Sequence, residues 1–159
     1  MILNLLLTSF TKQPVFIFQM TVVIREVRGN LFQTTESMCH CISSDFRLGR
    51  GIARVFRRKF PRIMELKTLN IGRGGFVYLP VGGNFVYNLI TKDRFFEKPS
   101  YVDLRKSLEA MKIHVISRGV GRISLPRIGC GLDRLEWYIV KQILYEVFHD
   151  CNLVLTVYF

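Results

Sequence analysis

Lys92 is the residue with the clearest chemical potential, because an apolar run from Leu89 to Thr91 leads directly into its amine. A lysine at the end of a buried strand can act as a nucleophile when desolvation or neighbouring cations lower its pKa. Arg94 and Lys98 are the nearest candidates for such cations. A solvated lysine that follows a strand is far commoner, and the local sequence does not decide between the two.

Asp133 closes a second candidate loop, in which Gly129, Cys130 and Gly131 lie between a predicted strand and a predicted helix. A Gly-x-Gly turn at that position can hold a phosphate with its backbone N–H groups. With Glu136 three residues later, Asp133 also resembles the capping box of the following helix, and the local pattern favours that cap. Cys130 has no histidine close in sequence to act as a base, so a small buried cysteine is favoured over a nucleophile.

A third loop, from Ser43 to Gly51, also joins a predicted strand to a predicted helix. Its glycines allow the backbone to approach a ligand closely, and the N–H groups at the start of a helix favour phosphate. Such loops are common, so this signal is weak when taken alone. The overlapping segment from Arg47 to Arg62 holds seven basic residues and no acidic one, which predicts an exposed basic face.

The elements that would position these loops alternate between strands and helices. Strands are predicted at 21–28, 38–42, 76–79, 85–91, 122–125 and 153–158, and helices at 51–60, 61–69, 101–118 and 134–149. Gly82-Gly83-Asn84 is a hairpin turn signal, and Ser100 with Asp103 three residues later predicts an N-cap. This alternation implies an α/β fold with a mixed central sheet that is covered by helices on both faces. Ligands in such folds bind beyond the carboxyl ends of the strands, where all three loops would lie.

Composition narrows the class of partner. The 159 residues include 23 Lys and Arg against 12 Asp and Glu, which gives a formal net charge of +11, and 49% are hydrophobic. That length suits one domain, and the apolar content excludes global disorder. The charge predicts an anionic partner, such as nucleic acid, a phosphorylated ligand or an anionic membrane surface.

The four cysteines lack the paired spacing of a disulfide scaffold, which favours a reducing compartment, and Cys39-His40-Cys41 lacks the second ligand pair that zinc needs. Residues 1–20 are apolar but have neither the basic flank of a signal peptide nor the uninterrupted length of a membrane span. We expect 1–20 to be an N-terminal extension, with Met20 as an alternative natural start, and one domain over 21–159.

Together these segments resemble a macrodomain, of the branch of the terminal ADP-ribose protein glycohydrolase that also deacylates O-acyl-ADP-ribose. The similarity runs from about Ile24 to Tyr158. It rests on GNLF at 29–32, HCIS at 40–43, RLGRGIA at 47–53, YNLITK at 87–92, KPSY at 98–101, SLEAM at 107–111 and PRIGCGLDRL at 126–135.

This resemblance implies a metal-independent hydrolase without a cofactor. Lys92 would attack the anomeric C1″ of the distal ribose and form a lysyl adduct, and Asp133 would be the general acid/base that resolves it. The resemblance further implies that ADP-ribose contacts Asn30, Leu31, Ser43, Leu48, Gly49, Gly51, Arg127, Ile128, Gly129, Cys130, Gly131 and Leu132. Asn30 stands where the family commonly has aspartate, and the lost charge predicts an affinity weaker by about 1 kcal/mol.

The expected substrates are ADP-ribosylated acidic side chains and O-acyl-ADP-ribose. We expect a monomer in the nucleus, the cytoplasm or both, with no membrane partner. One alternative is a non-catalytic module that binds ADP-ribose, although the presence of both Lys92 and Asp133 favours the enzyme. Docking of nucleic acid or poly(ADP-ribose) on the segment from Arg47 to Arg62 is a further prediction, compatible with either.

Overall fold

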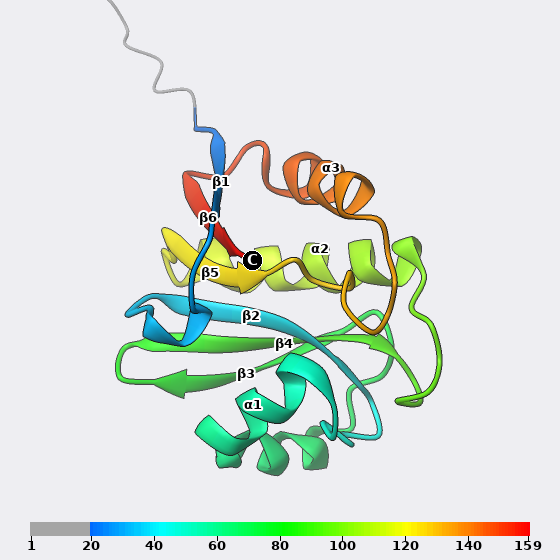
Figure 1. The fold of residues 1–159 in the computed structure, drawn as a ribbon. Helices are drawn as coiled ribbons and strands as arrows, with labels where there is room; N and C mark the ends of the chain where they lie inside the picture. Colours follow the sequence, from blue (N-terminus) through cyan, green and yellow to red (C-terminus); the bar gives the residue numbers. More distant parts are fainter. Residues whose placement is uncertain (1–19) are drawn as a thin grey trace, which may run out of the picture.

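The computed structural model describes residues 20–159, so the predicted extension, apart from Met20, lies outside the described residues. Six strands form one sheet in the order β1-β6-β5-β2-β4-β3 (Figure 1). They are β1 (Val22–Val27), β2 (Ser37–Ser43), β3 (Phe76–Val81), β4 (Asn84–Lys92), β5 (Arg122–Pro126) and β6 (Leu153–Tyr158). All neighbouring strands are parallel except the antiparallel pair β3 and β4, so the prediction of a mixed sheet is confirmed.

Helices cover both faces of the sheet, as the alternating pattern predicted (Figure 1). On one face, α2 (Tyr101–Ser117) and α3 (Trp137–Phe148) bury a core that includes Leu108 and Leu144. On the other, α1 (Gly51–Lys59) and the 3-10 helix η2 (Pro61–Leu69) bury Phe56 and Ile63 against the sheet. A short 3-10 helix, η1 (Leu31–Gln33), follows β1. Within residues 20–159, no helix has the length and apolar character needed to cross a membrane.

Two local signals position their elements as the sequence predicts. The hydroxyl of Ser100 accepts a hydrogen bond from the Asp103 N–H and begins α2. Gly82 and Gly83, with φ of 53° and 83°, form the two-residue turn between β3 and β4. Positive φ at both central residues is what a twisted hairpin requires, so glycine is favoured there.

The predicted cap at Asp133 is wrong. The helix α3 begins at Trp137 rather than near Arg134, and Glu136 is its N-cap residue. Arg134 adopts a left-handed φ of 59°, and the Leu135 N–H donates to the Gly129 carbonyl at 2.8 Å. Because Leu135 is buried in the core, the chain closes a compact loop here instead of a helical turn. The Asp133 side chain is directed into the candidate site.

Candidate active site

Three adjacent parallel strands, β5, β2 and β4, end at the same edge of the sheet. Ile42 pairs with Ile90 but Ser43 pairs with Lys92, so Thr91 is an extra residue that forms a β-bulge. Bulges beside active sites change the direction in which the next side chain points. The bulge at Thr91 therefore sets the direction of Lys92.

Lys92 and Asp133 meet at this edge from positions 41 residues apart. The Lys92 Nζ lies 2.5 Å from the Asp133 Oδ1, and the two side chains are only 12% and 18% exposed. The contact of Lys92 is thus with a carboxylate, whereas the predicted cationic neighbours Arg94 and Lys98 are exposed. Such a pair can exchange a proton, which would convert the ammonium group into a nucleophilic amine.

Two thiols adjoin this ion pair. Burial raises the pKa of Cys41, and the nearby charge of Asp133 raises it further. Burial also raises the pKa of Cys130, to about 11, and its Sγ donates to the Ile128 carbonyl. Both thiols are therefore protonated at neutral pH, which argues against Cys130 as a nucleophile, although it is half-buried rather than fully buried. In the described part of the chain, no three His, Cys, Asp or Glu side chains are grouped as a metal site.

Asp45 organises the loop after β2 and was missed by sequence reasoning. Its carboxylate accepts hydrogen bonds from the Ser43 hydroxyl at 2.5 Å and from the N–H groups of Arg47 and Phe95. Burial alone would raise the pKa of Asp45, but these hydrogen bonds lower it below its usual value. The carboxylate thereby ties the loop of Ser43 to the loop that follows Lys92. The Ser-x-Asp spacing is a weak local signal that could have indicated this turn.

The two glycine loops face each other across the site. Gly51, with φ of 56°, begins α1, and a Cβ there would lie 3.3 Å from the Leu132 side chain of the other loop. Leu132 is 67% exposed, and Gly49 and Gly131 are also exposed. The α1 N-terminus has no side-chain cap. Exposed backbone N–H groups of this kind can bind an anion.

Two residues predicted to contact the ligand have buried side chains, and a third is a glycine that packing requires. Leu48 and Ile128 are buried in the two cores. Gly129 has a φ of 70°, and a Cβ there would lie only 2.7 Å from the Leu135 Cδ1. Glycine at 129 is therefore required by packing, and these residues could contact a ligand mainly through the backbone.

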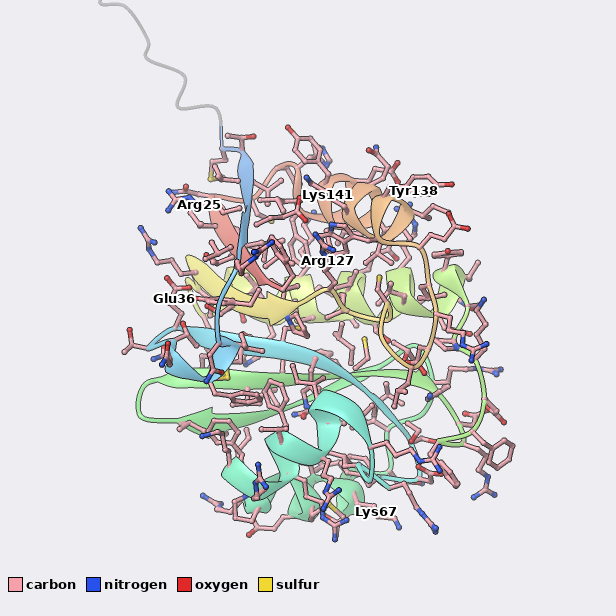
Figure 2. All side chains as sticks on the ribbon, in the orientation of Figure 1. Arg25, Glu36, Lys67, Arg127, Tyr138 and Lys141 are labelled. Atoms are coloured by element: carbon pink, nitrogen blue, oxygen red, sulfur yellow. The ribbon has the colours of Figure 1, made fainter. Side chains whose placement is uncertain are left out.

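The remaining predicted contacts lie around the carboxyl ends of β1 and β6. The Asn30 side chain accepts a hydrogen bond from the Phe32 N–H at 3.0 Å and caps η1, in which Leu31 is buried. The Arg127 guanidinium lies 3.2 Å from Glu26 and 4.4 Å from the centre of the Phe159 ring. Figure 2 shows Arg127 near Lys141, which binds the same glutamate.

Two hollows in the surface lie apart from the ion pair. One, of about 390 Å³, is lined by Phe32, Lys59, Phe60 and the start of β4, at the opposite end of the sheet. The other, of about 330 Å³, is lined by Ser44, Asp45, Lys67, Asp93 and Arg94. Neither Lys92 nor Asp133 lines either hollow.

Comparisons with known proteins agree with this fold. No family model matches the chain. ADP-ribose glycohydrolase OARD1 from Bos taurus is 48% identical over 137 residues, which are 85% of this chain and 90% of that protein. The human OARD1 is 47% identical over the same shares. The macrodomain of Thermus aquaticus DarG has a TM-score of 0.78 at 23% identity and covers 87% of this chain and 99% of its own.

The chain therefore belongs to the macrodomain family. Within that family it is similar to the OARD1 glycohydrolases over most of its length, and it is a hydrolase. The solved macrodomain of Thermosipho africanus DarTG is described in complex with ADP-ribose and has a TM-score of 0.76 at 16% identity, over 86% of this chain and 41% of that one.

Proposed function

We propose that this protein is an ADP-ribose glycohydrolase that removes ADP-ribose from acidic side chains and deacylates O-acyl-ADP-ribose, without a metal ion. The observation that carries this proposal is the Lys92–Asp133 contact of 2.5 Å at the carboxyl edge of the sheet. The similarity to OARD1 glycohydrolases supports ADP-ribose as the ligand.

In the first step, the Lys92 ammonium group gives a proton to Asp133. The amine lone pair then forms a bond to C1″ of the distal ribose. The bond between C1″ and the ester oxygen breaks, and its electron pair leaves with the carboxylate of the acceptor side chain. A carboxylate is a good leaving group, so an amine nucleophile is sufficient and no Lewis acid is needed.

In the second step, water replaces Lys92 at C1″. Asp133, once it has lost its proton to the leaving group or to solvent, accepts a proton from this water. The new bond from the water oxygen to C1″ releases ADP-ribose, and the electron pair of the broken bond returns to the Lys92 nitrogen. Both side chains are less than one-fifth exposed, and such low exposure strengthens the electrostatic interactions that guide proton transfer.

The diphosphate would be bound mainly by backbone N–H groups of the two facing glycine loops. This assignment is supported by the uncapped start of α1 and by the proximity of Gly51 to Leu132. The Asn30 side-chain oxygen Oδ1 already accepts one hydrogen bond, from the Phe32 N–H, and keeps a second lone pair for the adenine end of the ligand. Asn30→Asp is expected to raise the affinity for ADP-ribose about fivefold, because a charged acceptor binds more strongly.

The test combines calorimetry with ADP-ribose and turnover of a mono-ADP-ribosylated glutamate peptide and of O-acetyl-ADP-ribose. The proposal predicts both binding and release of ADP-ribose. Lys98→Ala, which removes an exposed lysine of the neighbouring loop, is the matched control for Lys92→Ala. Binding without turnover by the unmodified chain would support the alternative, a non-catalytic ADP-ribose-binding module.

A further inference from the structure

One exposed side of α1 carries a row of arginines. Arg50 is the N-cap residue, and Arg54, Arg57 and Arg58 follow it in the helix. All four are exposed, while Phe56 is buried on the opposite side. Residues four, seven and eight positions apart lie above one another on a helix, so the four charges form a single stripe. Figure 2 shows nitrogen-tipped side chains around this layer, where Lys67 is labelled.

These cations have few counter-ions. Among the ion pairs of residues 20–159, only Arg62–Glu65 involves the segment from Arg47 to Leu69. No acidic residue lies in the first turn of α1. Arginines four positions apart repel each other, and the helix dipole opposes cations at the N-terminus. An anion on this face would relieve both costs.

Two exposed aromatic rings lie beside Arg47, whose backbone carbonyl accepts a hydrogen bond from the Arg57 guanidinium of the stripe. Phe95 is 42% and Phe96 is 74% exposed, and their ring centres lie 5.4 Å apart, edge to face. The Arg47 guanidinium lies 4.9 Å from the centre of the Phe95 ring. The Phe95 N–H donates to Asp45, in the loop that leads into α1. Exposed rings beside arginines are the arrangement on which unpaired bases stack.

The acidic groups near these rings are engaged by other residues. Asp45 accepts the hydrogen bonds described above, and Asp93 lies 3.4 Å from the Arg73 guanidinium. The surface also adjoins the catalytic edge, because the Ser44 N–H donates to the Lys92 carbonyl at 2.9 Å.

We infer that the α1 stripe and the Phe95–Phe96 pair form a docking surface for single-stranded nucleic acid. The arginines would contact successive phosphates, and the two rings would stack on unpaired bases. The phosphates of a duplex could also contact the arginines. Its bases stay stacked inside the double helix, however, so they would not reach the two phenylalanine rings. An anionic membrane would likewise engage the charges without requiring base stacking.

The test is fluorescence anisotropy with a labelled single-stranded DNA of about 12 nucleotides, within the usual site size of such proteins. The triple variant Arg54→Gln, Arg57→Gln and Arg58→Gln is expected to weaken binding at least tenfold. It should also flatten the slope of log affinity against log salt by about 2, since each phosphate contact contributes about 0.7 for single strands. Phe96→Ala should weaken binding about tenfold with an unchanged salt slope, because a stacked base carries no charge.

The matched control is Arg25→Gln, Lys106→Gln and Arg118→Gln, which removes the same charge from exposed positions on β1 and α2 and after it. This variant should bind nearly as well as the unmodified chain. Equal loss of binding in the two triple variants would overturn the inference, because net charge alone would then explain binding. Duplex DNA or phosphatidylserine vesicles that bind as tightly as the single strand would also overturn it. Turnover of an ADP-ribosylated peptide by each triple variant provides the control for folding.

Discussion

The two helical layers of this protein differ in whether their cations have acidic partners. In the layer of α2 and α3, two partly buried cations are paired: Arg105 with Glu146, and Lys112 with Asp150. In the layer of α1 and η2, the arginine stripe has almost no acidic partners. Between the layers, Lys92 and Asp133 form the one ion pair of residues 20–159 in which both side chains are less than one-fifth exposed.

This contrast separates three uses of charge. Exposed pairs contribute little to stability, because water screens them and their long side chains lose entropy. A largely buried pair costs desolvation energy that its attraction barely repays, so Lys92–Asp133 is poorly explained by stability alone. Neighbouring unpaired cations on one helix face repel each other, and the anionic partner proposed above would relieve that repulsion. The proposed chemistry thus rests on the buried pair, and the proposed docking on the α1 stripe.

The largest expected effect is on turnover. The double variant Lys92→Met and Asp133→Leu should abolish release of ADP-ribose from a glutamate-linked substrate, because it removes both the nucleophile and the acid/base. Its free energy of unfolding should equal or exceed that of the unmodified chain, since apolar residues of similar size often replace a buried ion pair without loss. Urea unfolding and a turnover assay measure both quantities. Retained turnover would refute the assignment of the chemistry.

The next largest effect is on stability at low pH, and it arises from the fully buried imidazole of His40. Its Nε2 lies 2.6 Å from the Asn88 Oδ1 and donates to it, because the Asn88 amide nitrogen donates to the Val77 and Val86 carbonyls. The imidazole stacks on the Phe56 ring of α1 at 3.8 Å. Burial lowers the pKa of His40 from 6.5 to about 4.

The folded state favours the neutral form of His40. The stability that depends on this neutral imidazole is therefore fully present above pH 6.5. It should be lost as the pH falls from 6.5 to about 4, by about 3 kcal/mol in total. Urea unfolding across this range measures it, with His40→Gln expected to flatten the pH dependence. The control is His149→Gln, at an exposed histidine. A pH dependence unchanged by His40→Gln would contradict this account.

The smallest effect is a direct test of the contrast between layers. Arg54→Gln should raise the free energy of unfolding by about 0.5 kcal/mol, because it removes repulsion from Arg50 and Arg58. Arg105→Gln, in the other layer, should lower it slightly through loss of the contact with Glu146. Chemical unfolding at low salt measures both changes. Changes of the same sign would remove the difference between the layers.

Much of the fold could be predicted from sequence because its signals are local. Alternating apolar residues and the Gly82-Gly83 turn located the strands, and Ser100 with Asp103 located the start of α2. The start of α3 was misplaced because the deciding feature is tertiary. Burial of Leu135 holds Arg134 in a left-handed conformation, which no local pattern indicates.

The candidate site likewise combines residues that local sequence could identify with contacts that only the folded chain creates. Local sequence left Lys92 undecided between a nucleophile and a solvated lysine, and it favoured Asp133 as a cap. Their contact across 41 residues depends on the β-bulge and the compact loop. Only the resemblance to a macrodomain assigned them a shared role. Asp45 was missed because its hydrogen bonds join two loops that are distant in sequence.

In the proposed mechanism, Lys92 forms a covalent bond to the distal ribose, and Asp133 is needed to break it. Intact-protein and peptide mass spectrometry of Asp133→Ala, incubated with a mono-ADP-ribosylated glutamate peptide, tests this most directly. Without Asp133 the Lys92 ammonium group can lose its proton only to solvent, so the adduct should form slowly and then persist. The expected result is a protein heavier by one ADP-ribose, with the modification on Lys92 and none in Lys92→Ala. Normal turnover by Lys92→Ala, or an adduct on another residue, would contradict it.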